Sequence, residues 1–284
     1  MSPSYLPFLK NLNPLMNHLW EIFSYIILGL IQGLTEFLPV SSSGHLTLGT
    51  AILQLPEEDL TFSVLVHGAT ALSTIVIFRE DLVNLITGIF KKNEVGKEAR
   101  KYVGLLVLSA IPAAAVGLTF KDQIEGLASS SFVGAMLIIT AAILAISQKV
   151  TSMPKGSIGT GTSLIIGLAQ AGAIFPGISR SGSTIGAALL LGISRAEAAK
   201  FSFLMALPPI IGANLLEIKD ILGNEAATTV ETSSITYVGY TIGVIAAFIA
   251  GLVACKWMIK LVKGTNLMWF AVYCFVVGIL ALIV

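Results

Sequence analysis

The sequence predicts an all-α polytopic membrane protein with an inverted-topology repeat, in which each half contains one re-entrant helix hairpin plus three transmembrane helices. Three observations lead to this fold class. Of the 284 residues, 55% are hydrophobic and only 12% are charged, whereas soluble domains carry about 25% charged residues. Two polar stretches interrupt the apolar chain, one in each half. Basic residues gather in alternate connecting segments, as they do in the cytoplasmic loops of membrane proteins.

Composition also excludes several classes of function. The net charge of +1 gives no basic surface of the kind that nucleic acid requires, so no nucleic-acid partner is expected. Cys255 and Cys274 lie in late apolar segments without the spacing of metal ligands, which favours a packing role. Residues 1–19 contain three prolines and are predicted to form an N-terminal interfacial tail rather than a cleaved signal peptide.

The first repeat is predicted over residues 20–150. An apolar run ends at Pro39 and a run of serines, and only about ten apolar residues follow, which is too short to cross a bilayer. Residues 20–55 are therefore predicted to form a re-entrant helix hairpin. Three full transmembrane spans are expected after it, at residues 62–78, 102–120 and 132–147.

The second repeat is predicted over residues 151–284 and has the same order of segments. Its re-entrant hairpin is expected at residues 163–193, and its three spans at residues 201–216, 235–254 and 267–284. Residues recur at a nearly constant offset of about 140 positions, which indicates an internal repeat. The matching pairs are Gly29 and Gly167, Gln32 and Gln170, Ser41 and Ser179, Ser43 and Ser181, Gly44 and Gly182, and Phe62-Ser63 and Phe201-Ser202.

The distribution of Lys and Arg gives the orientation. Segments 79–101, 149–155 and 256–263 are basic and are placed inside, while the acidic segments between them are placed outside. Each half has an odd number of crossings, so the second half starts on the opposite face and the repeat is inverted. In such proteins the broken helices meet near the midplane and build the site. The first hairpin is expected to enter from outside and the second from inside.

The first polar stretch carries the elements of a nucleophilic site. Gln32 and Glu36 are four residues apart and share one face of a helix. Pro39 ends that helix, and the serines that follow lie where a new helix begins, with unpaired amides that suit an anion. Ser42 and His45 are three residues apart, so a hydroxyl lies within reach of an imidazole. Such a pair, with a carboxylate nearby, is the minimum for an activated nucleophile.

The second polar stretch brings an arginine into an apolar context. The guanidinium of Arg180 fits phosphate or carboxylate oxygens in a bidentate manner. Gly177 and Gly182 allow close approach of backbone to a ligand. Ser179, Ser181, Ser183 and Thr184 add hydroxyl donors. Together the two stretches indicate a lipid phosphate as the substrate.

Some of these polar residues also have simpler structural explanations. Ser41 and Ser43 are more simply explained as helix caps, and Glu36 could be a hydrogen-bonded structural carboxylate. His67, in an otherwise apolar span, is interpreted as a satisfied interior histidine rather than a site residue.

The stretch from Glu36 to His45, together with Pro176–Gly182 and Thr184, resembles the undecaprenyl-diphosphate phosphatase family linked to bacitracin resistance. The resemblance covers essentially the whole chain. It implies hydrolysis of undecaprenyl diphosphate to undecaprenyl phosphate and inorganic phosphate at the outer face of the bacterial cytoplasmic membrane. That reaction recycles the carrier lipid of cell-wall synthesis.

The resemblance also implies roles for individual residues. Ser42 would be the nucleophile, His45 the base or acid, Glu36 its carboxylate partner and Arg180 the phosphate clamp. The expected substrate contacts are Gln32, Ser41, Ser43, Gly44, Ser179, Ser181, Gly182 and Thr184. The family also implies a divalent cation, Mg or Ca, with Glu36 as the candidate metal ligand. Gln32 stands where the family pattern commonly has Glu, and this weakens the case for a metal bound by two carboxylates.

Other interpretations stay open from sequence alone. A secondary transporter or flippase of an anionic isoprenoid phosphate lipid would also use inverted repeats with broken hairpins, because fold does not fix function. A purely structural scaffold gives Glu36 and Arg180 no reason to lie in the membrane. The sequence does not decide whether Ser42 or His45 attacks. Membrane lipid is an expected partner, and a homodimer is also open.

Overall fold

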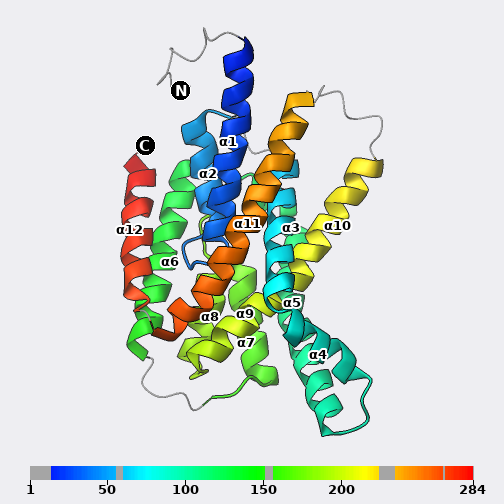
Figure 1. Cartoon of the computed structure of the whole chain (residues 1–284). Coiled ribbons are helices and arrows are strands. Elements are labelled where there is room, and N and C mark those ends of the chain that lie inside the picture. The colour runs from blue at the N-terminus through cyan, green and yellow to red at the C-terminus, as the bar shows by residue number, and fades with distance from the viewer. Residues whose placement is uncertain (1–13, 56–59, 151–155, 224–233, 265, 284) are drawn as a thin grey trace.

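The computed structural model describes residues 14–55, 60–150, 156–223, 234–264 and 266–283, and all regular secondary structure in these ranges is helical. The helices are α1 (Pro14–Thr35), α2 (Ser42–Leu53), α3 (Leu60–Ile77), α4 (Arg79–Ile89), α5 (Glu94–Glu125), α6 (Ser130–Val150), α7 (Thr160–Gly172), α8 (Arg180–Leu190), α9 (Arg195–Met205), α10 (Leu207–Gly223), α11 (Ser234–Gly264) and α12 (Met268–Ile283). Figure 1 shows the longer helices, such as α1, α6 and α11, running along a common direction.

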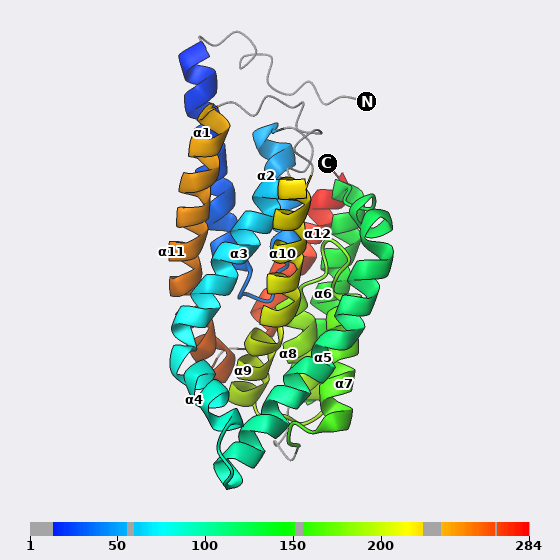
Figure 2. The ribbon, with the colours of Figure 1, turned by 90° about the vertical axis from the view of Figure 1, so that its right-hand side faces the viewer.

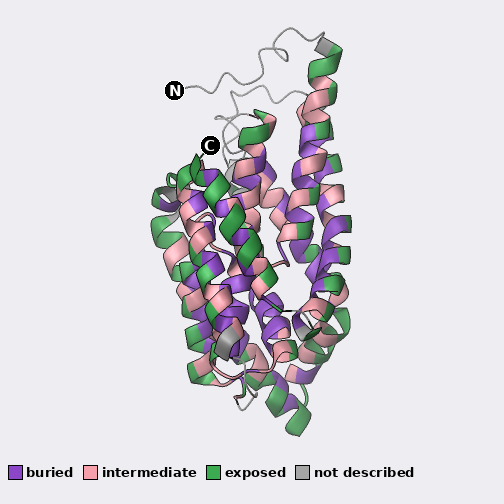
Figure 3. Cartoon of the chain, turned by 90° about the vertical axis from the view of Figure 1, so that its left-hand side faces the viewer, coloured by how far each residue is buried: buried purple, intermediate pink, exposed green. Residues whose placement is uncertain are grey.

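The predicted all-helical membrane class is confirmed. Among the described residues, four helical segments are long and apolar enough to cross a bilayer, and the bent pair α3–α4 raises the number to five. Helix α12 is apolar but shorter. Figure 3 shows exposed residues on the outward sides of the helices and buried residues between them, and many of the exposed ones, such as Val253 and Phe275, are large and apolar. An apolar exterior of this kind suits a lipid environment.

The boundaries differ from the prediction in several places. Helix α11 runs to Gly264, so the basic segment 256–263, expected between helices, is helical. The segment 79–101, expected as a basic loop, contains α4 and the start of α5, and α4 bends from α3 by 75°. The span expected at 201–216 begins at Arg195, and its helix is interrupted at Ala206 just before two prolines, which remove backbone donors. Residues 14–19, expected in the tail, belong to α1, and residues 1–13 lie outside the described part of the chain.

Two helix hairpins face each other from opposite ends of the bundle. Figure 1 shows α1 and α2 in the upper half of the molecule and α7 and α8 in the lower half. Helices α2 and α8 begin in the same way: the Ser41 hydroxyl accepts from the amide of Gly44 at 3.2 Å, and the Ser179 hydroxyl accepts from the amide of Gly182 at 3.0 Å. A serine cap stabilises the first turn of a helix by about 1 kcal/mol. Both polar stretches therefore end at a capped helix start.

Glycines let helices approach closely. A Cβ atom on Gly29 of α1 would lie 2.1 Å from the Gly243 carbonyl oxygen of α11, and one on Gly167 of α7 would lie 2.5 Å from the Ser109 carbonyl oxygen of α5. Figure 1 shows α1 along α11, and Figure 2 shows α5 beside α7. Small residues at helix contacts are typical of membrane proteins, because they allow backbones to pack directly.

Substitution of Gly29 tests this packing. In Gly29→Ala the new methyl group meets backbone rather than a movable side chain, so α1 and α11 must separate. We expect a loss of about 1–3 kcal/mol, the usual cost of overpacking, visible as a lower melting temperature in detergent. Gly104→Ala in α5 is the matched control, since a Cβ atom there meets nothing within 4 Å. Equal melting temperatures for the two variants would contradict the close approach.

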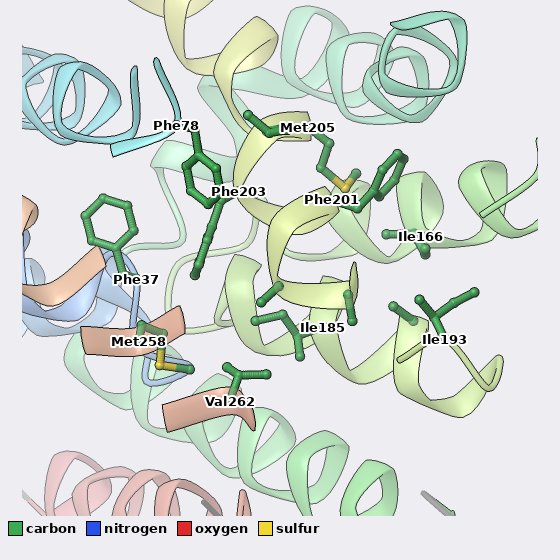
Figure 4. Packing of buried hydrophobic residues seen from close by; sticks show 14 of the residues in the cluster. Phe37, Phe78, Ile166, Ile185, Ile193, Phe201, Phe203, Met205, Met258 and Val262 are labelled. Carbon is green, nitrogen blue, oxygen red and sulfur yellow. The ribbon is translucent and has the colours of Figure 1, made fainter. Parts of the chain in front are cut away.

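An aromatic cluster anchors the first polar stretch to the second half of the chain. Phe37, which follows Glu36 directly, packs edge-on against Phe203 of α9 with ring centroids 5.6 Å apart. Phe78 approaches the same ring at 6.2 Å. Figure 4 shows these rings with Ile185 and Met258 in one continuous core. Because Phe37 is only 1% exposed, the backbone that carries Glu36 is held in place by packing.

Candidate functional site

Glu36 lies at the centre of the candidate site, in the turn after α1, and is 7% exposed. Its Oε1 accepts a hydrogen bond from Arg180 Nη2 at 2.6 Å. Its Oε2 accepts from Ser42 Oγ at 2.6 Å and from Gln32 Nε2 at 3.1 Å. The Glu36 carboxylate thus joins residues of both polar stretches. Glu36 and Arg180 are 144 positions apart in the sequence.

Arg180 is the first residue of α8 and is held from both sides. Its Nη1 donates to the Ser202 carbonyl oxygen of α9 at 3.2 Å, while Nη2 bonds to Glu36. The side chain is 18% exposed. A guanidinium has five N–H donors in a rigid fork, so after these two contacts Arg180 still has donors that an anion could use.

Gln32 lies one helical turn before Glu36, in the first polar stretch. Its side chain is fully buried, and its Nε2 donates to Glu36. Its Oε1 is buried and has no hydrogen-bond partner among the described residues. Since buried polar atoms are normally paired, this oxygen marks an acceptor position beside the carboxylate.

Most of the predicted substrate contacts have structural partners. Ser41 caps α2 and has a positive φ of 70°, which is uncommon for a residue other than glycine and signals local strain beside Ser42. Ser43 Oγ lies 3.3 Å from Ser41 Oγ. Ser179 caps α8, and Ser181 donates to the Leu38 carbonyl oxygen at 3.0 Å. The capping interpretation is therefore confirmed for Ser41 and wrong for Ser43, which lies inside α2. Ser181 ties the two polar stretches together.

Thr184, Gly44 and Gly182 lie where the two polar stretches and α9 meet. Thr184 Oγ1 donates to the Arg180 carbonyl oxygen at 2.8 Å and lies 2.6 Å from Ser202 Oγ. A Cβ atom on Gly44 would lie 3.2 Å from Gly177 Cα, and one on Gly182 would lie 3.4 Å from the Pro39 side chain. The absence of side chains at Gly44 and Gly182 therefore lets the two polar stretches touch.

The two ring nitrogens of His45 have partners other than Ser42. Its Nδ1 lies 2.8 Å from the Ser41 carbonyl oxygen and its Nε2 lies 2.7 Å from the Tyr273 hydroxyl, and the two rings stack with centroids 5.6 Å apart. A carbonyl only accepts, so Nδ1 donates and Nε2 of the neutral ring accepts from Tyr273. The role of His45 as base or acid stays a prediction, and it requires the ring to leave one of these partners.

Sequence reasoning missed three neighbours of the site besides Tyr273. Thr140 of α6 donates to the Gly177 carbonyl oxygen and accepts from the Ser179 amide, at 3.2 and 3.0 Å, and so fixes the second polar stretch. Ser202 supports Arg180 and Thr184. His67 Nε2 lies 3.8 Å from Glu36 Oε2, so its interpretation as an interior histidine overlooked the carboxylate. The sequence contains one signal for His67. The repeat pairs it with Ala206, so the first half has an imidazole where the second half has only a methyl group.

The donor set around Glu36 does not fit a resident divalent cation. Mg and Ca take six or more oxygen ligands, mostly carboxylates, carbonyls and water. Here one carboxylate is paired with a guanidinium and a hydroxyl, and its neighbour Gln32 adds only an amide oxygen. No group of three or more His, Cys, Asp or Glu residues that could hold a metal occurs within the described ranges. The structure therefore does not identify Glu36 as a metal ligand.

Comparison of the sequence with known proteins identifies the family of the chain. The family model described as bacitracin resistance protein BacA matches residues 25–280. An undecaprenyl-diphosphatase of Christiangramia forsetii is 49% identical over 270 residues, covering 93% of this chain and 98% of that protein. One of Bacteroides fragilis is 47% identical over 268 residues, with 93% and 98% coverage. Undecaprenyl-diphosphatase 1 of Bacillus cereus is 39% identical over 274 residues, with 94% and 99% coverage. The chain belongs to the bacitracin resistance protein BacA family.

Proposed function

We propose that this protein is an integral membrane phosphatase that hydrolyses undecaprenyl diphosphate to undecaprenyl phosphate and inorganic phosphate, and so recycles the carrier lipid of the cell wall. Family membership and the names of its relatives support the substrate. The observation that carries the chemistry is that Glu36 holds the Ser42 hydroxyl and the Arg180 guanidinium on its two oxygens. A nucleophile, a proton acceptor and a phosphate-binding cation are thereby brought together.

In this mechanism Arg180 binds the diphosphate, because its fork pairs with phosphate oxygens. Ser42 Oγ attacks the terminal phosphorus, and the bond from that phosphorus to the bridging oxygen breaks, so that the lipid leaves as a monophosphate. Glu36 Oε2, 2.6 Å from the hydroxyl, orients it and takes its proton. Water then releases inorganic phosphate from Ser42. The amides at the starts of α2 and α8 favour an anion at the same place.

The proposal includes the divalent cation that the family implies, but only as an ion that arrives with the substrate. A Mg or Ca ion would enter on the diphosphate and neutralise its charge, since the described residues around Glu36 do not supply a sufficient set of oxygen ligands. No residue is assigned as its ligand. A homodimer stays a prediction from sequence.

The membrane arrangement in this proposal is the inverted repeat, with halves 20–150 and 151–284 in the bacterial cytoplasmic membrane and the site open to the outer side. Three features support it: the paired serine caps, the paired glycine contacts of α1 with α11 and α7 with α5, and the entry of the hairpins from opposite ends in Figure 1. The basic segments between helices support the orientation.

Phosphate release from the C55 or farnesyl diphosphate in detergent tests the function. Purified wild-type protein is expected to release inorganic phosphate in multiple turnovers, and loss of release in Ser42→Ala, His45→Ala and Arg180→Ala would assign the activity to this site. If the wild-type protein releases no phosphate but moves the lipid between the leaflets of reconstituted vesicles, the transporter function replaces this one.

A further inference from the structure

His67 is the histidine that lies beside the Glu36 carboxylate. It is on α3, and its Nε2 is 3.8 Å from Glu36 Oε2. The histidine is 27% exposed, whereas Glu36 is 7% exposed. The imidazole therefore lies between the buried carboxylate and accessible space. At this separation a water molecule or a substrate oxygen can also bridge the two groups.

The hydrogen bond at the other ring nitrogen determines which nitrogen of His67 carries a proton. Nδ1 lies 2.7 Å from the Ser63 carbonyl oxygen. Because a carbonyl only accepts, Nδ1 must be the protonated nitrogen. In the neutral ring, Nε2 therefore carries a lone pair, and this lone pair faces Glu36 Oε2. The ring is arranged to receive a proton from the direction of the carboxylate.

Glu36 needs such a neighbour if it takes the proton of Ser42. Its Oε1 is paired with Arg180, which is 18% exposed, and a carboxylic acid in that place would leave the arginine with a neutral partner. Breaking a buried ion pair is costly. Gln32, the other neighbour of Oε2, cannot accept a proton at its amide nitrogen. His67 is the base beside this oxygen among the contacts that the structure shows.

We propose that His67 is the final proton acceptor of the site and acts through Glu36, an inference that rests on the proposed phosphatase function. As Ser42 Oγ bonds to the terminal phosphorus, the lipid monophosphate leaves with the electron pair of the broken bond. The Oγ proton moves to Glu36 Oε2 and on to His67 Nε2, so that the carboxylate regains its charge beside Arg180. When water attacks phosphoserine, Oγ leaves and recovers this proton along the same route, and the inorganic phosphate carries both hydrogens of the water.

Two substitutions of His67 separate this role from simple packing. His67→Asn places an amide near Nδ1 and can keep the hydrogen bond to Ser63, while His67→Gln places an amide near Nε2. Neither amide accepts a proton. Both variants are expected to lower kcat about 100-fold, within the range for general acid–base groups, with KM changed by less than about twofold. His18→Gln, on α1, is the matched control and is expected to keep wild-type kcat and KM.

The coupling with Glu36 tests the route. If the proton reaches His67 only through Glu36, then Glu36→Gln already removes the benefit of His67, and adding His67→Gln should cause no further loss of kcat. The inference is overturned if His67→Gln retains kcat within about twofold of wild type, or if the losses in the double variant multiply. Absence of phosphate release from the wild-type protein would instead remove the proposed function on which the inference rests.

Discussion

Arg180→Ala is expected to lower kcat/KM for undecaprenyl diphosphate by at least about 1,000-fold, which corresponds to roughly 4 kcal/mol of transition-state stabilisation. Two losses combine in this variant. The diphosphate loses its bidentate partner, and Glu36 becomes a buried carboxylate without the cation that holds Oε1. Removing one member of a buried pair costs about 3–5 kcal/mol. The measurement is phosphate release over a range of substrate concentrations.

Arg180→Lys shows which part of the side chain matters. Lysine keeps the charge but lacks the planar fork, so the contacts with Glu36 and with the Ser202 carbonyl oxygen cannot both be kept. We expect this variant to fall between wild type and Arg180→Ala. Arg79→Ala, whose side chain is 67% exposed, is the matched control for loss of a positive charge. If Arg180→Ala keeps the activity of Arg79→Ala, Arg180 is not the phosphate clamp.

Ser42→Ala is expected to lower kcat by about 1,000-fold or more, because the attacking oxygen is removed while Glu36 and Arg180 keep their ion pair. The residual rate would come from the remaining electrostatic stabilisation. Since the wild-type protein would form a phosphoserine, a rapid quench with substrate labelled in the terminal phosphate, run in parallel in acid and in base, should trap acid-stable label on the protein. The Ser42→Ala variant should trap none.

The nature of the trapped adduct gives the decisive control. Thr50→Ala, in the same helix α2, should trap label as the wild-type protein does. Label that is stable in base and lost in acid would indicate phosphohistidine, and His45 would then take the place of Ser42 as nucleophile. That result would require the imidazole to leave Tyr273, to which its Nε2 is bonded at 2.7 Å.

Local features of the sequence predicted the parts of the fold that depend on local physics. Polar breaks and serine caps mark helix ends because their hydrogen bonds reach only three residues along the chain. The all-helical class followed from the apolar composition, since backbone groups in lipid must be paired within the helix. The proximity of Glu36 and Arg180 was predicted only indirectly, from the expected inversion of the two halves, and their hydrogen bond is seen directly.

Features that depend on packing between distant segments were not predicted. Tyr273 reaches His45 across 228 positions, and no local pattern distinguishes it from other aromatic residues in an apolar helix. Thr140 and Ser202 look like ordinary polar residues in spans, because their roles come from the backbone groups that they meet. The basic residues of segment 79–101 predict a loop where α4 lies, although Glu80 and Asp81 at the start of α4 favour a helix.

The carboxylate and its counter-ion come from opposite halves of the polypeptide, with Glu36 before residue 150 and Arg180 after it. A fragment that contains only one half would therefore place a lone charge in an apolar surrounding, and neither fragment could assemble a reaction centre. If the gene arose by duplication and fusion, each copy became indispensable once it had specialised, one retaining the carboxylate and the other the guanidinium. Cutting the chain between α6 and α7 should give two inactive pieces, and co-expression of both pieces should restore turnover.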